Sequence, residues 1–357
     1  MNWRIVAILA SVVPFLVLFL TTKVSPGDVF ALGVVPFAMS ATAALSRNFL
    51  QAIRFKYYIR RFIGRDVSST AKTVEARLGG EFVTSTTPSY VGGEFVRIAW
   101  LAKNGVPPGK AAWVATMEII TDVFVGSMLA FMAGIVAILR GGTVIGSIVI
   151  LVTIPTFAVW LVLVLVSSKR TLRLPNFVLP LLQKFIAKQK AQSLVESANT
   201  AISDLCQMSR ENFGQKKTLA TFAAGLAITF VAFIAYGASF MILANAAGSK
   251  IGLFDSLMST SASTSIANLP ITIGGSALAE LGIWAYLANL SGIPDYSAFV
   301  HDSQLKVIIA WRITTYHIPL AVSWIALMRL TTRKATPPNP DQISVNPADN
   351  PGDPPAK

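Results

Sequence analysis

Two segments of the sequence combine a proline, a pair of glycines and a carboxylic acid in the same order. The first reads TPSYVGGE and the second LPITIGGSALAE, and in both the proline stands four residues before the glycine pair. Proline ends a helix and glycine permits a tight chain reversal, so we expect a new helix to begin after each pair. The free N–H groups at such a start favour an anion, for example a phosphate. The motif residues are Pro88, Gly92, Gly93 and Glu94, followed by Pro270, Gly274, Gly275 and Glu280.

Further ionisable residues lie in apolar surroundings, where charges are costly and often functional. Glu118 and Asp122 are four residues apart, so they share one face of a helix. Two acids on one face need a cation, which Arg97 or Arg312 is expected to supply. For Arg312 two other roles are open, because it could pair with Glu280 or contact a lipid phosphate. A purely structural ion pair is the alternative to a functional one.

The composition indicates that lipid is the main solvent of this chain. Of the 357 residues, 53% are hydrophobic and 13% are charged, whereas a soluble domain has roughly 25% charged residues. The mean hydropathy is +0.60. These values exclude a disordered chain, a fibrous protein and an ordinary soluble enzyme. One cysteine and two histidines predict neither an internal disulfide nor a metal centre, and we expect no cofactor.

Six stretches are long and apolar enough to be membrane spans. Two other apolar regions, Phe82–Leu101 and Leu253–Leu290, contain the motifs and are interrupted by proline and glycine, so each predicts a re-entrant helical hairpin. The predicted fold is therefore an all-α polytopic membrane protein with six transmembrane helices and two re-entrant hairpins. The spans are Ile5–Leu20, Val29–Leu45, Ala111–Leu139, Val144–Val166, Thr218–Ala246 and Leu305–Leu330.

The basic residues indicate orientation. The net charge is +13, and lysine and arginine gather between spans two and three, between spans four and five, and after span six. The positive-inside rule then predicts cytoplasmic termini and a multi-pass protein of the cytoplasmic (inner) membrane. This topogenic role explains the charge without nucleic acid, and membrane lipids are the expected partners. The sequence leaves the oligomeric state open.

The two halves of the chain predict an inverted repeat. Residues 1–140 and 143–332 each contain two spans, a broken hairpin and a third span, and the halves enter the membrane in opposite orientations. Such repeats are typical of secondary transporters, which bind substrate at the repeat interface. A cytoplasmic insert, 167–217, shows helical spacing of apolar residues. The tail, 333–357, is rich in Pro, Asn and Asp and is expected to be disordered.

TPSYVGGEFVRIAWL, MEIITD and LPITIGGSALAELG resemble the lysylphosphatidylglycerol synthase transmembrane region family, the flippase-like membrane half of the multiple peptide resistance factor. The resemblance covers about residues 1–332. It departs from the family at Ile119, where an arginine is common, and from the tail after residue 332 we expect no synthase domain. The positions that match the family's motifs are Pro88, Gly93, Glu94, Arg97, Glu118, Asp122, Pro270, Gly274, Gly275 and Glu280.

The resemblance implies a non-enzymatic domain that translocates a lipid or lipid-linked amphiphile with a polar or anionic headgroup. Two alternatives stay open. One is an accessory or scaffold protein for a cytoplasmic enzyme that modifies lipids or glycolipids, recruited through the insert. The other is a lipid transferase, although no paired nucleophile and base is evident in the sequence.

Overall fold

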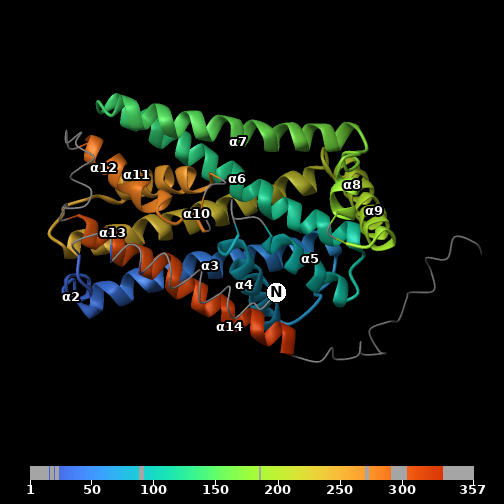
Figure 1. Cartoon of the computed structure of the whole chain (residues 1–357), viewed down its shortest axis with the longest axis horizontal. Helices are drawn as coiled ribbons and strands as arrows, with labels where there is room; N and C mark the ends of the chain where they lie inside the picture. Colours follow the sequence, from blue (N-terminus) through green and yellow to red (C-terminus); the bar gives the residue numbers. More distant parts are fainter. Residues whose placement is uncertain are drawn as a thin grey trace, which may run out of the picture.

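The computed structural model describes Leu16, Leu20 and residues 24–87, 92–184, 186–269, 272, 274–290 and 304–332, and these form helices without strands. The long helices run side by side along one axis (Figure 1). Most of the predicted first span, Ile5–Leu20, and the predicted disordered tail, 333–357, lie outside the described residues. The helices are α2 Pro26–Phe30, α3 Val34–Ile63, α4 Thr70–Ser85, α5 Gly93–Lys103, α6 Pro108–Leu139, α7 Thr143–Lys169, α8 Val178–Gln183, α9 Lys188–Asn212, α10 Lys216–Ala246, α11 Leu253–Ala267, α12 Leu278–Leu290, α13 Leu305–Arg312 and α14 Ile318–Thr332, with a π-helical turn, η2 Ile313–His317, between the last two.

Among the described residues, three helices, α6, α7 and α10, are long and apolar enough to cross a membrane. They contain 32, 27 and 31 residues, more than the ~20 that a span requires. They coincide with the predicted third, fourth and fifth spans to within about three residues. The predicted sixth span is observed as α13, η2 and α14, which continue one another. The chain is therefore an all-helical protein with apolar membrane-type helices.

The predicted second span, Val29–Leu45, has the wrong limits. Gly33, with φ +94°, separates the short helix α2 from α3. Helix α3 then continues for 30 residues to Ile63 and ends at Gly64 in the left-handed conformation. No proline or glycine interrupts residues 37–63, so nothing in the local sequence stops the helix. Much of the basic segment that was assigned to a cytoplasmic loop is in fact helical.

Both interrupted regions form helix pairs, as the sequence predicts. Helices α4 and α5 contact each other, and so do α11 and α12. The first break contains Gly92 at φ +126°, and the second contains Gly274 and Gly275 at φ +57° and +61°. The α4–α5 pair lies toward one end of the bundle and the α11–α12 pair toward the other (Figure 1). Pro88 and Pro270 lie outside the described residues.

Helices from the two predicted halves of the chain pack against each other. Helix α3 packs against α10. The first helix of each interrupted pair packs against the last long helix of the other predicted half, so that α4 contacts α14 and α11 contacts α6.

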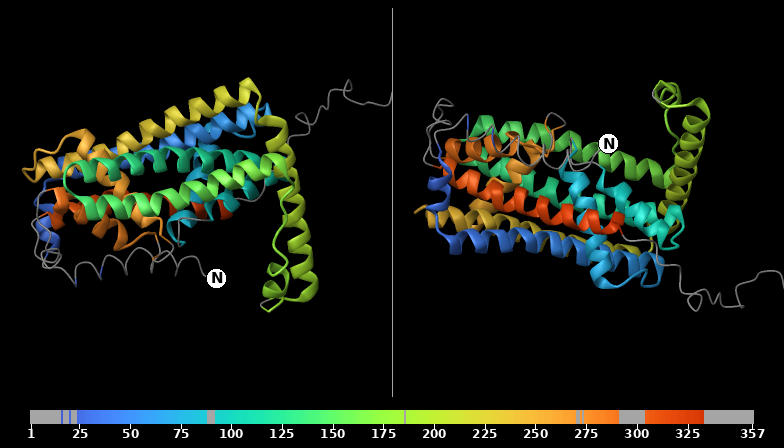
Figure 2. Two further views of the ribbon diagram at one scale, coloured as in Figure 1. Left: turned by 90° about the horizontal axis from the view of Figure 1, so that it is seen from above. Right: turned by 60° about the horizontal axis from the view of Figure 1, so that its bottom comes forward.

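One end of the bundle carries the helix pair of the insert. Helices α8 and α9 occupy part of residues 167–217, and α9 crosses the bundle end almost at right angles to the long helices (Figure 2). Trp113 of α6 meets Phe213, which follows α9, with ring centroids 5.2 Å apart in an edge-to-face arrangement. The insert is therefore packed against the bundle through aromatic side chains.

Candidate functional site

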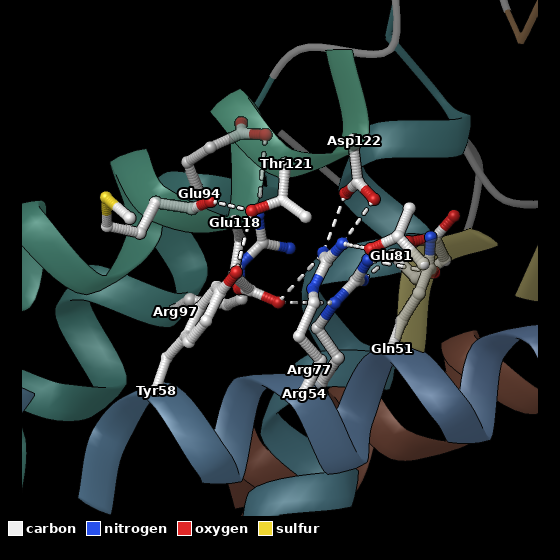
Figure 3. Close-up of polar contacts among 12 residues, drawn as sticks. Gln51, Arg54, Tyr58, Arg77, Glu81, Glu94, Arg97, Glu118, Thr121 and Asp122 are labelled. Carbon is white, nitrogen blue, oxygen red and sulfur yellow. Dashed lines mark hydrogen bonds and ion pairs between the residues drawn. The ribbon is translucent and has the colours of Figure 1, made fainter. Parts of the chain in front are cut away.

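A buried carboxylate, Glu118, lies among three arginines (Figure 3). The side chain of Glu118 is 1% exposed. Its Oε1 atom lies 3.4 Å from Arg54 Nη2 and 3.4 Å from Arg77 Nε, while Oε2 lies 3.0 Å from Arg97 Nε. An unpaired ion is strongly disfavoured away from water. Three elements, α3, α4 and α5, therefore each contribute a cation to one acid on α6.

Asp122, one turn after Glu118, receives both branches of Arg54. Arg54 Nη1 donates to Asp122 Oδ1 at 2.6 Å and Nη2 donates to Oδ2 at 2.8 Å. This two-point contact fixes the planar guanidinium against the planar carboxylate. Arg54 is fully buried and also donates to the hydroxyl of Thr229 on α10. The charge cluster thus joins helices of both halves.

Arg77 extends the cluster along α4. It donates to Glu81 at 2.6 Å and to the side-chain oxygen of Gln51 at 3.0 Å. The sequence predicts Arg97 or Arg312 as the cation for Glu118 and Asp122. Arg97 does contact Glu118, and two further arginines from the basic segment between the predicted second and third spans, Arg54 and Arg77, lie on α3 and α4 and contact it as well.

The first motif places its acid at the start of α5. Gly92 donates its backbone N–H to Glu94 Oε2 at 2.7 Å, and Arg97 Nη2 lies 3.4 Å from Glu94 Oε1. The carboxylate of Glu94 therefore occupies the helix start at which an external anion was expected. Gly93 permits the close approach of α5 to α4, because a Cβ there would overlap the Gly80 carbonyl oxygen and the Thr84 hydroxyl.

The second motif forms a separate ion pair. Arg312 Nε lies 2.9 Å from Glu280 Oε1, and both side chains are buried. Arg312 also donates to the carbonyl of Gly274, and its guanidinium lies 4.2 Å from the centre of the Tyr316 ring. Of the roles left open for Arg312, pairing with Glu280 is therefore observed. The restart differs from the first motif, because α12 begins at Leu278, three residues after Gly275.

The two motifs lie next to each other. The hydroxyl of Tyr316 donates to the carbonyl of Ser85, the last residue of α4, at 3.1 Å. A Cβ at Gly274 would overlap both the Ser85 carbonyl oxygen and the Tyr316 hydroxyl. The end of α4 and the glycine pair of the second motif are therefore in contact at Ser85.

A cavity of about 580 Å³ opens between these elements. Of the predicted site residues, Glu94, Arg97, Asp122 and Arg312 line it. Glu118 and Glu280 do not line the cavity but form ion pairs with arginines that do. The motif glycines allow the backbones to approach closely. Further polar lining residues come mainly from α3, α4, α7 and α11, and they include Arg47, Asn48, Gln51, Arg77, Glu81, Thr153, Ser261, Thr264 and Ser265, with Asn268 just after α11.

The residues that the sequence analysis missed carry a recognisable spacing. Arg47, Gln51 and Arg54 are separated by four and three residues, and Arg77 and Glu81 by four, so each set lies on one helix face. This spacing indicates a helix face, although it continues to the exposed Arg61. An exposed pair, Arg60 and Asp66, shows the contrast at the bundle end: hydrogen bonds from Arg60 lower the pKa of the Asp66 carboxyl.

Comparison with known proteins gives two findings. The family model described as the lysylphosphatidylglycerol synthase TM region matches residues 4–323. A protein named UPF0104 membrane protein, from Archaeoglobus fulgidus, is 26% identical over 275 residues, which is 75% of this chain and 78% of the relative. The range matched by the family model contains the charge cluster and both interrupted regions, and the relative matches three quarters of this chain.

Proposed function

We propose that this chain, which belongs to the lysylphosphatidylglycerol synthase transmembrane region family, moves a lipid between the leaflets of the cytoplasmic membrane. The lipid, or lipid-linked amphiphile, has a polar or anionic headgroup. The observation that carries the proposal is the cavity of about 580 Å³, which is lined by arginines, carboxylates and hydroxyls inside a bundle of apolar helices. Such a lining is expensive in lipid and suits a polar group that has left the aqueous surface.

The arrangement suits alternating access. In this proposal the chain has six spans and two re-entrant hairpins, with both termini in the cytoplasm. Non-helical backbone at membrane depth is tolerated where it is buried in protein or lines a wet cavity, and the end of α4 contacts the glycine pair of the second motif at Ser85 beside the cavity. One arm of each hairpin packs against the last helix of the other half. A rocking motion of the halves would therefore expose the cavity to one side of the membrane and then to the other. The acyl chains stay in the bilayer.

A leaflet-exchange assay tests the proposal. The purified protein is reconstituted in liposomes that contain a fluorescent phospholipid, and the rate at which the dye becomes accessible to an impermeant quencher is measured. Glu94→Gln removes the carboxylate that lines the cavity and accepts from Gly92. We expect the exchange rate to fall at least tenfold, while the elution volume of the purified protein is unchanged.

Asp66→Asn is the matched control, because Asp66 is exposed and also pairs with an arginine. It should exchange lipid at the wild-type rate. Exchange by Glu94→Gln at the wild-type rate would remove the named site from the mechanism, and a wild-type protein that exchanges no lipid from a broad panel would refute the function.

A second candidate, an accessory protein for a lipid-modifying enzyme, is favoured by the insert. Phe177, Leu181 and Leu194 are exposed apolar side chains on or beside α8 and α9, a type of surface used for protein contacts. The double variant Leu181→Glu, Leu194→Glu separates the candidates. A carrier keeps its exchange rate in liposomes, whereas a scaffold exchanges nothing there and loses its function in cells when these residues are changed.

A further inference from the structure

Helix α11 carries an unusual number of hydroxyls for a buried helix. Its sequence, LFDSLMSTSASTSIA, contains seven serine and threonine residues among 15. All of them but Thr264 are buried. Some have a packing role: Ser263 donates to the Ala279 carbonyl, and Gly282 comes close to the Ser263 backbone. Ser259, Thr260 and Thr264 donate to backbone carbonyls of the preceding turn. Ser261 is the cavity-lining hydroxyl of α11 that still needs an explanation.

Ser261 shows what that explanation is. It is 2% exposed, its Oγ atom has no hydrogen-bond partner among the described residues, and it lines the cavity. A buried hydroxyl without a partner costs free energy that a bound polar group would recover. Thr264 and Ser265 line the same wall, and Ser265 exchanges a hydrogen bond with Thr153 of α7 at 2.8 Å. Each hydroxyl offers one donor and two acceptor positions, so this wall retains unused acceptors.

Arg47 supplies a charge to the same cavity. Its guanidinium lies 4.3 Å from the ring centre of Tyr236 and 5.4 Å from that of Phe233, both on α10. Arg77, Arg97 and Arg312 also line the cavity, but each contacts a carboxylate. Arg47 makes no ion pair with any residue that the structure describes, and its buried Nε has no hydrogen-bond partner there. It is the cavity arginine best able to accept an incoming anion.

We infer that the lipid headgroup has two parts, a phosphate that binds Arg47 and an uncharged polyhydroxyl group, such as a sugar or polyol, that binds the hydroxyl wall of α11 and α7. The inference rests on the proposed function and names its substrate class. An ammonium-bearing headgroup fits less well, because the cavity carboxylates Glu81, Glu94 and Asp122 already receive hydrogen bonds from arginines. A polyol can donate to, and accept from, the hydroxyls without displacing these pairs.

The test measures binding rather than transport. The full chain in detergent is titrated with four short-chain lipids, and affinity is read from the shift in thermal unfolding. The probes are dioctanoyl phosphatidylinositol, dioctanoyl phosphatidic acid, dioctanoyl phosphatidylcholine and a dioctanoyl glucosyl diacylglycerol. Phosphatidylinositol, which has both parts, should bind about tenfold or more tightly than the other three. Equal affinity for phosphatidylinositol and phosphatidic acid would overturn the inference.

Two variants test which residues bind the phosphate and which bind the polyhydroxyl group. Arg47→Gln should lower the affinity for phosphatidylinositol by about tenfold and leave that for the glucosyl lipid unchanged, and Arg47→Lys should restore part of the loss. Ser261→Ala combined with Thr264→Val should lower the affinity for phosphatidylinositol without changing that for phosphatidic acid. Wild-type affinities in both variants would overturn the assignment.

The chain offers matched controls. Arg61 is an exposed arginine on the same helix as Arg47 and also lies over a tyrosine ring, that of Tyr57 at 5.5 Å. Ser259 is a buried serine of α11 whose hydroxyl donates to Ser256. Arg61→Gln and Ser259→Ala should bind all four lipids as the wild type does, and a loss of selectivity in either would count against the named residues.

Two further measurements separate this inference from the proposed function. Selective binding without leaflet exchange supports the headgroup assignment and refutes transport, whereas equal exchange of all four lipids supports transport and refutes the assignment. Inositol 1-phosphate, the free headgroup, should bind more weakly than the lipid. If it binds as tightly, the ligand is a soluble polyol phosphate and the lipid assignment fails.

Discussion

At the scale of single residues, each buried charge in the cluster around Glu118 requires an oppositely charged partner. Arg54 is the central cation, because it contacts both Glu118 and Asp122 and has no exposed surface. Removing one member of a buried pair leaves the other as an uncompensated charge, which costs much more than the pair contributes when it is intact. The arginines therefore keep α3, α4 and α5 in register with α6.

We predict that Arg54→Ala destabilises the protein by about 3–5 kcal/mol, measured as chemical unfolding in detergent. Arg54→Lys should recover only part of the loss, because an ammonium does not make the two-point contact with Asp122. The exposed Arg60→Ala, which breaks the pair with Asp66, should leave the unfolding midpoint unchanged. A midpoint of Arg54→Ala equal to that of the wild type would show that the cluster does not hold the fold.

Sequence reasoning recovered part of this cluster. The spacing of Glu118 and Asp122 predicted a shared face, and Arg97 and Arg312 were correctly expected to meet acids. Arg47, Arg54 and Arg77 were missed, since arginines between spans are usually topogenic. Only the tertiary structure shows that these three belong to helices that enter the bundle.

At the scale of elements, the interrupted helices depend on close backbone approach. Gly93 is the first residue of α5 and faces Gly80 and Thr84 of α4. The order of proline and glycine pair predicted that both regions would break, because these residues act locally. The end of α3 could not be predicted by hydropathy, since its last turns mix arginine and lysine with Phe55, Tyr58 and Ile59, which are buried against residues of α5 and α6.

We predict that Gly93→Ala destabilises the protein by about 1–3 kcal/mol and slows leaflet exchange, because the added Cβ would overlap the Gly80 carbonyl oxygen. Unfolding in detergent and exchange in liposomes measure the two effects. Gly252→Ala is the control: Gly252 has a negative φ, and nothing lies within 4 Å of an added Cβ. If both variants behave alike, the close contact of α4 with α5 is not required.

At the scale of the whole molecule, the distribution of basic residues distinguishes the two ends of the helix bundle. The end of the bundle that carries α9 also holds the end of α7 and the start of α10 (Figures 1 and 2). Lys169, Lys216 and Lys217 lie at this end, and the α10–α11 loop at the opposite end contains Lys250. The positive-inside rule therefore predicts that the α9 end faces the cytoplasm.

Cysteine labelling in intact cells tests this orientation. The chain has one cysteine, Cys206, which is buried, so the background for an impermeant thiol reagent should be low. Gln215 and Ser249 are exposed and flank the two ends of α10. We expect Ser249→Cys to be labelled from outside, and Gln215→Cys to be labelled only after the membrane is permeabilised. The reverse pattern would invert the topology, and labelling of both from outside would show that α10 does not cross the membrane.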